Sequence, residues 1–179
     1  MAGEQAGRAK SAAEEEATPS NFAIYRAGGT TPEIQLTIAL ILVARRWRAL
    51  LDERLRPIEQ SSARMEAMSA IMNAPGPNAQ IDIAKRLRIE GPTMTRMVDA
   101  LSTDGLVERQ QSPHDRRTNF LTVTQQGEEV LERIFAITQP LRARLLAGLS
   151  EEQVRQMNEL LGLLLARLDE GLPEEGTAG

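Results

Sequence analysis

Apolar residues in the middle of the chain recur at helical spacing in two adjacent short segments. The first segment, 81–87, is followed by a four-residue break and by Pro92, which suits the first turn of a helix because no N–H is needed there. The second segment, 91–104, ends before Gly105, the usual kind of residue just past a helix. The positions predicted to face inward are Ile83, Ala84, Leu87, Met94, Met97, Val98 and Leu101. The pattern predicts two helices joined by a tight turn.

Two short strands are predicted next, at 106–110 and 118–123, on either side of a loop rich in turn residues. Helix, tight turn, helix and a hairpin with a basic tip is the order of a winged helix-turn-helix. Such a unit places its second helix in the major groove of DNA. We therefore expect a recognition helix at about 91–104 and a wing at about 106–123.

The segments before this unit also have helical patterns. Thr31, Pro32 and Glu33 form a good helix start, and the helix is expected to run to about Arg56. Its apolar residues cover more than one stripe, which is typical of a helix that packs on its own domain and on a second subunit. A further helix at about 63–73 has three methionines at spacings of three and four, a pattern typical of adaptable core.

After the wing, a long helix is predicted from Thr124, with a kink at Pro140. Ser150 and Gln153 form a capping box that opens a final leucine-rich helix. So many leucines on terminal helices exceed what a small winged helix can bury. Together with the first long helix, they indicate a helical dimer interface.

The predicted fold class is therefore mainly α with a small β-hairpin wing: a winged helix-turn-helix domain plus a helical dimerisation domain from both termini. The expected order is a flexible N-terminal extension at 1–30, an N-terminal dimerisation helix at 31–60, the winged helix-turn-helix at 61–124, C-terminal dimerisation helices at 125–171 and a tail at 172–179.

Composition excludes several classes of site. The chain has no cysteine and one histidine, so thiolate metal sites, disulfides and multi-histidine clusters are excluded, and no cofactor or metal is expected. No phosphate loop or nucleophile–base pair is present, so we do not expect an enzyme. No secretory signal or bilayer-length apolar run is visible, which predicts a cytoplasmic protein without membrane partners.

The net charge of −4 argues against nucleic acid as a partner when taken alone. Residues 81–117, however, hold seven basic and six acidic side chains, a local net charge of +1. An ordinary mixed-charge surface would have the same balance, so the placement of the arginines on the predicted motif decides in favour of DNA.

Four short motifs in this region resemble those of the MarR family of regulators. They are Thr95-Arg96, Gly105-Leu106-Val107-Glu108-Arg109, Asp115-Arg116-Arg117 and Val123-Thr124-Gln125-Gln126-Gly127. Two other stretches, 46–57 and 89–92, are similar to the SlyA-like branch of that family. The resemblance covers about residues 33–170.

The resemblance implies a homodimer on double-stranded DNA, with recognition helices in successive major grooves and wings in the flanking minor grooves. It implies that Arg96 contacts base edges, for which guanine is the best match, and that Arg116 enters a minor groove. Asp115 and Arg117 would pair and brace the wing. The remaining DNA-binding residues on this reading are Thr93, Thr95 and Arg109.

The resemblance also implies a small aromatic or other organic acid as effector. Arg45 and Arg48 match arginines that face a carboxylate, and Trp47 lies between them. The chain departs from the branch at Ala63, Met65 and Ser69, which stand where a threonine, a tryptophan and a histidine are typical. Met65 and Ser69 are retained as candidate effector-binding residues for a different, bulkier acid, and the absence of any physiological ligand remains the alternative.

One other function stays open at this stage. The acidic net charge is compatible with a winged helix used as a protein–protein assembly module without specific DNA binding, and contacts of the N-terminal extension with the transcription machinery are a related possibility. The sequence does not decide between repressor and activator, because that depends on where the operator lies.

Overall fold

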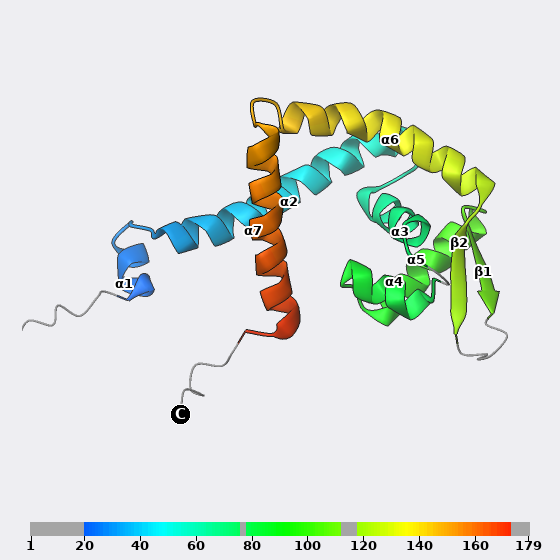
Figure 1. The fold of residues 1–179 in the computed structure, drawn as a ribbon, viewed down its shortest axis with the longest axis horizontal. Coiled ribbons are helices and arrows are strands. Elements are labelled where there is room, and N and C mark those ends of the chain that lie inside the picture. The colour runs from blue at the N-terminus through cyan, green and yellow to red at the C-terminus, as the bar shows by residue number, and fades with distance from the viewer. Residues whose placement is uncertain (1–19, 76–77, 112–117, 173–179) are drawn as a thin grey trace, which may run out of the picture. The chain divides into compact units, whose positions relative to one another are not determined.

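The computed structural model describes residues 20–75, 78–111 and 118–172 (Figure 1). Its elements are α1 Asn21–Arg26, α2 Pro32–Leu55, a 3-10 turn Arg56–Ile58, α3 Ser62–Met72, α4 Gln80–Leu87, α5 Gly91–Thr103, β1 Val107–Gln111, β2 Asn119–Val123, α6 Gln125–Leu145 and α7 Glu151–Glu170. The predicted fold class, mainly helical with a two-stranded wing, is confirmed.

The chain divides into two compact units, 1–49 and 50–179, which are described separately. This division falls inside α2, whereas the sequence predicted boundaries at about 30, 60 and 124. The predicted roles of those segments in dimerisation and DNA binding remain predictions.

Within unit 1–49, a short helix that the sequence reading missed precedes α2. The Ser20 side chain accepts a hydrogen bond from the Ala23 N–H at 3.2 Å and so caps α1. The predicted flexible extension at 1–30 is therefore helical at Asn21–Arg26. The phenyl ring of Phe22 and the phenol of Tyr25 are exposed. The start of α2 agrees with the prediction, because the Thr31 hydroxyl accepts from the Ile34 N–H at 3.4 Å.

Within unit 50–179, α3 lies at the centre of a small core. It packs against α4, α5, α6 and β2. The side chains with at most 2% exposure include Leu51, Leu55, Met68, Ile71, Ile83, Met94, Val98, Leu101, Leu121, Leu131 and Ile134. The methionine stripe of α3 is core only in part: Met68 is fully buried, Met65 is half-buried, and Met72 is 43% exposed. The stripe therefore belongs to the core at Met68 and lies at the surface at Met72.

The wing is an antiparallel hairpin in which Val107 pairs with Val123 and Gln111 pairs with Asn119. Both strands begin one residue later than predicted. Leu106 is excluded from β1 because its N–H bonds back to the Leu101 carbonyl at 2.9 Å, which closes the end of α5. β2 also carries a short third partner, since Ala79 forms an isolated bridge with Phe120 and so ties the start of α4 to the wing.

The junction between the wing and α6 depends on two residues. Thr124 caps α6 by accepting from the Gly127 N–H at 3.0 Å, and its own hydroxyl donates to the Gly105 carbonyl at 2.7 Å. A Cβ on Gly127 would lie 2.1 Å from the Leu106 carbonyl oxygen, so this position has no room for a side chain. The close approach of α6 to the wing therefore requires glycine here.

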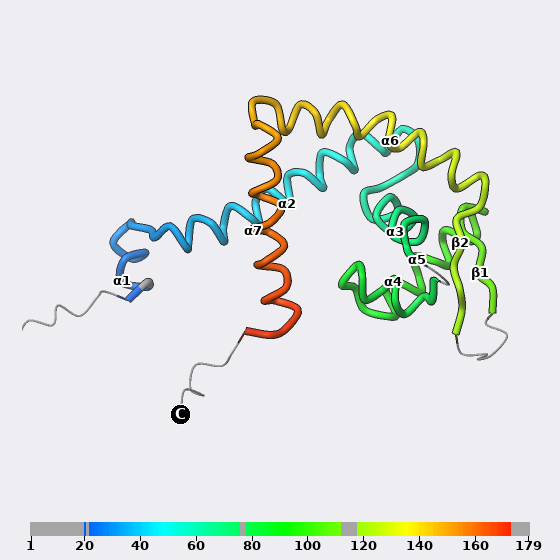
Figure 2. The backbone as a smooth tube through the Cα atoms, in the orientation of Figure 1, coloured from blue at the N-terminus to red at the C-terminus, as the bar shows by residue number. Residues whose placement is uncertain are grey.

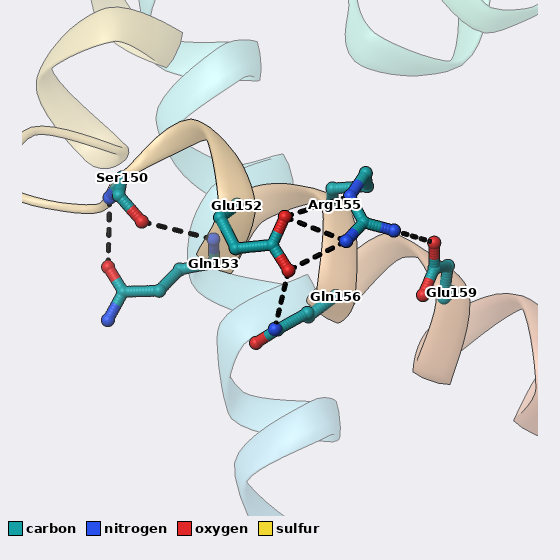
Figure 3. A network of polar contacts seen from close by, with 6 residues as sticks. All are labelled: Ser150, Glu152, Gln153, Arg155, Gln156 and Glu159. Atoms are coloured by element: carbon teal, nitrogen blue, oxygen red, sulfur yellow. Dashed lines mark hydrogen bonds and ion pairs between the residues drawn. The ribbon is translucent and has the colours of Figure 1, made fainter.

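The helix α6 continues through Pro140 and is followed by α7, which begins with the predicted capping box. The Ser150 hydroxyl accepts from the Gln153 N–H at 3.2 Å, and the Gln153 side chain accepts from the Ser150 N–H at 2.8 Å. Beyond the box, Arg155 donates to both Glu152 and Glu159, and a polar network covers one side of the helix (Figure 3).

None of the residues of α7 is buried, although the helix is rich in apolar side chains. Counted at 100° per residue, Met157, Leu161 and Leu168 share the side opposite to the polar network. Leu161 is 43% exposed and Leu168 is 64% exposed. This set, Val154, Met157, Leu161, Leu164 and Leu168, is the apolar face of α7.

Candidate nucleic-acid interface

The predicted recognition helix is α5, which lies beside α4 and the hairpin (Figure 2). Three side chains on one side of α5, Met94, Val98 and Leu101, have no measurable exposure. A helix repeats every 3.6 residues, so this burial fixes which side faces outward. Thr93 and Arg96 lie on the exposed part of the surface, with Arg96 roughly opposite the buried stripe. The packing therefore presents the residue predicted to read bases.

Arg96 lies three positions before Asp99, a spacing at which an arginine and a carboxylate can pair along a helix. Asp99 is instead approached by Arg109 from β1, with an Nη2–Oδ1 distance of 2.9 Å. Among the described residues, no ion pair of Arg96 is recorded. The wing strand thus neutralises the acidic neighbour and leaves the Arg96 guanidinium available to an outside partner.

Arg109 itself was predicted to bind DNA, and the structure gives it an internal role. Its side chain is 29% exposed and lies against Asp99. Its Nε and Nη2 are buried and have no aligned hydrogen bond within the described chain, so the approach to Asp99 is a charge contact and not a directed bond. Arg109 therefore connects β1 to α5 through this contact, and its contact with DNA remains a prediction.

The start of α5 is held by α4. Gln80 donates through Nε2 to the Thr95 hydroxyl at 2.9 Å, and that hydroxyl donates to the Gly91 carbonyl at 3.0 Å. The proton of Thr95 is therefore already used within the helix. Its remaining lone pair can accept but not donate, so a hydrogen bond from Thr95 to a phosphate oxygen requires breaking the bond to Gly91.

The end of α5 is held by α3 and α6. Asp104 follows the last residue of the helix, where a negative charge opposes the helix dipole. The Arg64 guanidinium offsets that charge by donating to Asp104 at 2.6 Å, and it also donates to Gln60 at 2.9 Å. Gln126 donates to the Asp104 carbonyl at 3.4 Å. The outward face of α5 is consequently fixed in orientation from three directions.

Sequence reasoning did not identify Gln80, Asp99 or Arg64 as functional, and a single sequence carries little signal for them. Arg64 and Asp104 are 40 positions apart, and Gln80 and Thr95 are 15 apart. Such pairs lie outside the local spacing rules that identify helices and caps. These pairs are formed by the tertiary fold, so the structure shows them and the sequence pattern does not.

The tip of the predicted wing, Asp115, Arg116 and Arg117, lies outside the described residues. The pairing of Asp115 with Arg117 and the minor-groove role of Arg116 remain predictions. The strand β1, which leads into this segment, packs on α5.

The predicted effector residues fall in two units. Arg45, Trp47 and Arg48 belong to α2 in unit 1–49, where both arginines are exposed and the indole is half-buried. Met65 and Ser69 belong to α3 in unit 50–179 and are half-buried. The effector site therefore remains a prediction.

Over the described ranges, no group of three or more histidine, cysteine, aspartate or glutamate side chains could hold a metal ion. In the same part of the chain, no helix is both long enough and apolar enough to cross a membrane.

Comparison with known proteins gives the following. The model of the MarR family matches residues 61–118. Among solved structures, a mutant MarR from E. coli complexed with operator DNA is 26% identical, with a TM-score of 0.66, and the match covers 74% of this chain and 94% of that one. The transcriptional regulator PA3341 is 29% identical, with a TM-score of 0.68 and coverages of 76% and 99%. An S. aureus MepR–DNA complex, 23% identical with a TM-score of 0.65 and coverages of 73% and 96%, shows the same fold.

Proposed function

We propose that this chain is a winged helix-turn-helix transcriptional regulator of the MarR family and not an enzyme, and that it binds a pseudo-palindromic DNA operator as a homodimer. Each copy inserts α5 into a major groove, and the two half-sites lie about one helical turn, roughly 34–36 Å, apart. Within the family we assign it to the SlyA-like branch, on the motifs at 46–57 and 89–92.

The observation that carries the proposal is the placement of Arg96. It projects from the outward side of a helix whose other side is fully buried, and its acidic neighbour Asp99 is engaged by Arg109. An arginine in this position suits the two acceptors on the major-groove edge of guanine. A related chain of the same fold, MarR from E. coli, has been solved in complex with operator DNA.

The test is a selection of bound genomic DNA fragments with the purified protein at about physiological salt. Wild type is expected to enrich a near-palindrome, and Arg96→Ala is expected to weaken binding by about 1–3 kcal/mol and relax the preference at one base position per half-site. Arg133→Ala, which removes the same charge from an exposed position on α6, is the matched control and should enrich the wild-type sequence.

Two outcomes would overturn the proposal. If a folded wild-type protein enriched nothing, the winged helix would be a protein–protein assembly module instead. If Arg96→Ala kept both the affinity and the preferred sequence, α5 would not be the recognition helix. Binding should also weaken steeply with salt, because phosphate contacts release counterions.

The homodimer is supported by the apolar side chains that the single chain leaves exposed. They are Leu36, Ile38, Ile41, Leu42 and Val43 on α2, and Met157, Leu160, Leu161, Leu165 and Leu168 on α7. Monomeric soluble proteins rarely expose large apolar patches, and each of these two helices by itself exposes several large apolar side chains. A second copy supplies the same surface by symmetry, so the two-fold interface can be closed by this chain alone. Sedimentation at micromolar concentration should give one species with twice the chain mass.

A small organic acid is the proposed effector, on the strength of Arg45 and Arg48, since guanidinium groups suit carboxylates. The measurement is release of the selected operator by a panel of aromatic and bulky aliphatic acids, each paired with its uncharged amide. Release by an acid but not by its amide, lost in Arg45→Gln, supports the site. Equal release by both members of each pair would contradict it.

A further inference from the structure

Arg88 and Asp169 join the turn of the helix-turn-helix to the last helix of the chain. Nε of Arg88 donates to Oδ1 of Asp169 at 2.7 Å, and Nη2 donates to Oδ2. Two parallel bonds between a guanidinium and a carboxylate define both the distance and the plane of the pair. The two residues are 81 positions apart, so the pair exists only through the fold. We call it the Arg88–Asp169 fork.

The backbone conformation of Arg88 is unusual for an arginine. Arg88 ends α4 in the left-handed region, at a φ of 53°, and its N–H bonds to the carbonyls of Ala84 and Lys85. Glycine or asparagine is the usual residue in this conformation, because a Cβ is disfavoured there. The turn itself therefore gains nothing from arginine, and the side chain has a use elsewhere.

A second layer of bonds anchors the fork in the DNA-binding lobe, defined here as α3, α4, α5, β1 and β2. Nη1 of Arg88 donates to the Arg86 carbonyl at 3.5 Å, and Nη1 of Arg86 donates to the Asn73 carbonyl at 3.4 Å. Asn73 is the residue that ends α3. The carboxylate of Asp169 is thus connected to the ends of two lobe helices and not to one loose side chain.

Little else joins α7 to the lobe. Over the described chain, α7 has no extensive packing with α3, α4, α5 or either strand. The polar network at its other end, around Glu152, Arg155 and Glu159, is closed within α7 itself (Figure 3). Apart from the chain connection through α6, which packs on α3 and β2, the Arg88–Asp169 fork is the side-chain hydrogen bonding that the described residues show between α7 and the lobe.

We propose that the Arg88–Asp169 fork fixes the angle between the DNA-binding lobe and α7, and thereby determines which spacing of operator half-sites the dimer accepts. The inference rests on the proposed function, because it places the apolar face of α7 against a second copy. With α7 fixed by the two-fold axis and α5 fixed within the lobe, the fork sets the separation of the two recognition helices. Arg88 and Asp169 are positioning residues that touch no base.

The side chains of the fork are about half exposed, at 47% and 49%. Exposed ion pairs contribute little to folding stability. Loss of the fork should accordingly leave the melting temperature almost unchanged and appear in spacing preference. This separates a positioning role from a merely structural one.

The first experiment uses the operator recovered by fragment selection, with its half-sites moved apart or together by one base pair. Wild type should reject both altered spacings, and Asp169→Asn should reduce this discrimination by about three- to tenfold while keeping the half-site sequence. Glu170→Gln, which removes the same charge one residue further along, is the matched control and should behave as wild type.

A reversed fork provides the rescue. Aspartate tolerates the left-handed region better than most residues, and an arginine near the end of α7 is favourable to the helix dipole. The double variant Arg88→Asp with Asp169→Arg should therefore recover at least part of the discrimination that either single change loses. Failure of every fork variant to alter spacing preference would overturn the inference.

The second experiment needs no DNA, so that it separates the fork from the proposed function. The chain has no cysteine, and Glu108→Cys on the exposed side of β1 gives one spin label per copy. The distance between labels in the wild-type dimer should be narrowly distributed, and it should broaden or shift in Asp169→Asn but not in Glu170→Gln. A narrow wild-type distribution that broadens in Asp169→Asn, in a protein that binds no DNA, would support the positioning role of the fork and overturn the proposed regulator function. Equal distributions in all variants, or a monomeric protein, would overturn the positioning role of the fork.

Discussion

The DNA-binding lobe and α7 differ in how each disposes of its apolar side chains. In the lobe, Met68, Met94, Val98 and Leu101 are fully buried by helices of the same chain. In α7, a helix of 20 residues with an equally clear apolar face, no residue is buried. Burial of a large aliphatic side chain stabilises the fold by about 1.5–3 kcal/mol. The lobe gains this stabilisation from its core side chains, whereas α7 within a single chain does not.

This difference indicates that the two regions are stabilised by different things. The lobe gains its stability within one chain and should be insensitive to protein concentration. The apolar face of α7 gains stability only when something covers it, and in the proposed dimer that is a second copy. Changes of the same chemistry should therefore have different consequences in the two regions.

The largest effect is expected from Leu161→Glu, in the apolar face of α7. An unpaired charge buried in an interface costs about 3–5 kcal/mol, so the dimer should weaken by more than a hundredfold. Sedimentation equilibrium measures this directly. Leu163→Glu is the matched control, because Leu163 is also half exposed but lies on the side of Glu152 and Arg155. If both variants dissociated equally, the apolar face would be wrongly assigned.

The next largest effect separates two glycines. Gly127→Ala places a methyl group 2.1 Å from the Leu106 carbonyl oxygen, so the wing and α6 must move apart, at a cost of about 1–3 kcal/mol or more. Gly162→Ala in α7 meets nothing within 4 Å and should stabilise that helix by about 0.5–1 kcal/mol. Thermal unfolding of both variants checks the opposite signs. Equal destabilisation would contradict the close approach at Gly127.

A smaller difference is expected between two helix caps. Thr124→Ala removes the cap of α6 and also the bond to the Gly105 carbonyl, while Ser150→Ala removes only the capping box of α7. A cap is worth about 0.5–2 kcal/mol, so the loss at Thr124 should lie at or above the upper end and the loss at Ser150 nearer the lower. Denaturant titrations would resolve the two, and a larger loss at Ser150 would contradict this order.

Elements that depend on local sequence patterns were predicted well, and features that depend on contacts outside those patterns were not. The helices α5 and α6 follow local rules, and the bounds of α5 and the start of α6 were predicted correctly or within one residue. The signals were Pro92 and the spacing of Met94, Val98 and Leu101 for α5, and the cap at Thr124 for α6. The strand β1 was displaced by one residue because the N–H of Leu106 bonds to the Leu101 carbonyl and closes the preceding helix, whereas β2 lacks only its first predicted residue, Thr118. The short helix α1 was missed because six residues with one cap carry too little periodicity.

The candidate site was predicted less completely than the fold. Arg96 was identified through the Thr95-Arg96 motif and Thr93 as a further residue on the exposed side of the helix, and the structure places both on the outward face of α5. Neither the residues that hold α5 nor the Arg88–Asp169 fork were identified, because Arg64 with Asp104 and Arg88 with Asp169 pair across long separations in the chain. Local sequence patterns do not encode such pairs, and only packing brings them together.

The smallest expected effect concerns pH and compares one carboxylate from each unit. Hydrogen bonds from Arg88 hold the pKa of Asp169 below its ordinary range, and a hydrogen bond with Thr31 likewise lowers the pKa of Glu33. A carboxylate whose pKa is lowered in the folded state stabilises the fold at pH values above its ordinary pKa. That stabilisation is lost as the pH falls through the lowered pKa. Both contributions should therefore be constant from about pH 5 to 8 and disappear only below about pH 4.

Carboxyl titration by NMR tests this difference residue by residue. Arg88→Gln should return the pKa of Asp169 to its ordinary range and leave that of Glu33 lowered, while Thr31→Val should do the reverse. Because the fork joins α7 to the lobe, the label distance in the Glu108→Cys dimer should change over the same acidic interval in which Asp169 takes up its proton. A distance that changed between pH 5 and 8 instead would assign the orientation of the lobe to some group other than Asp169.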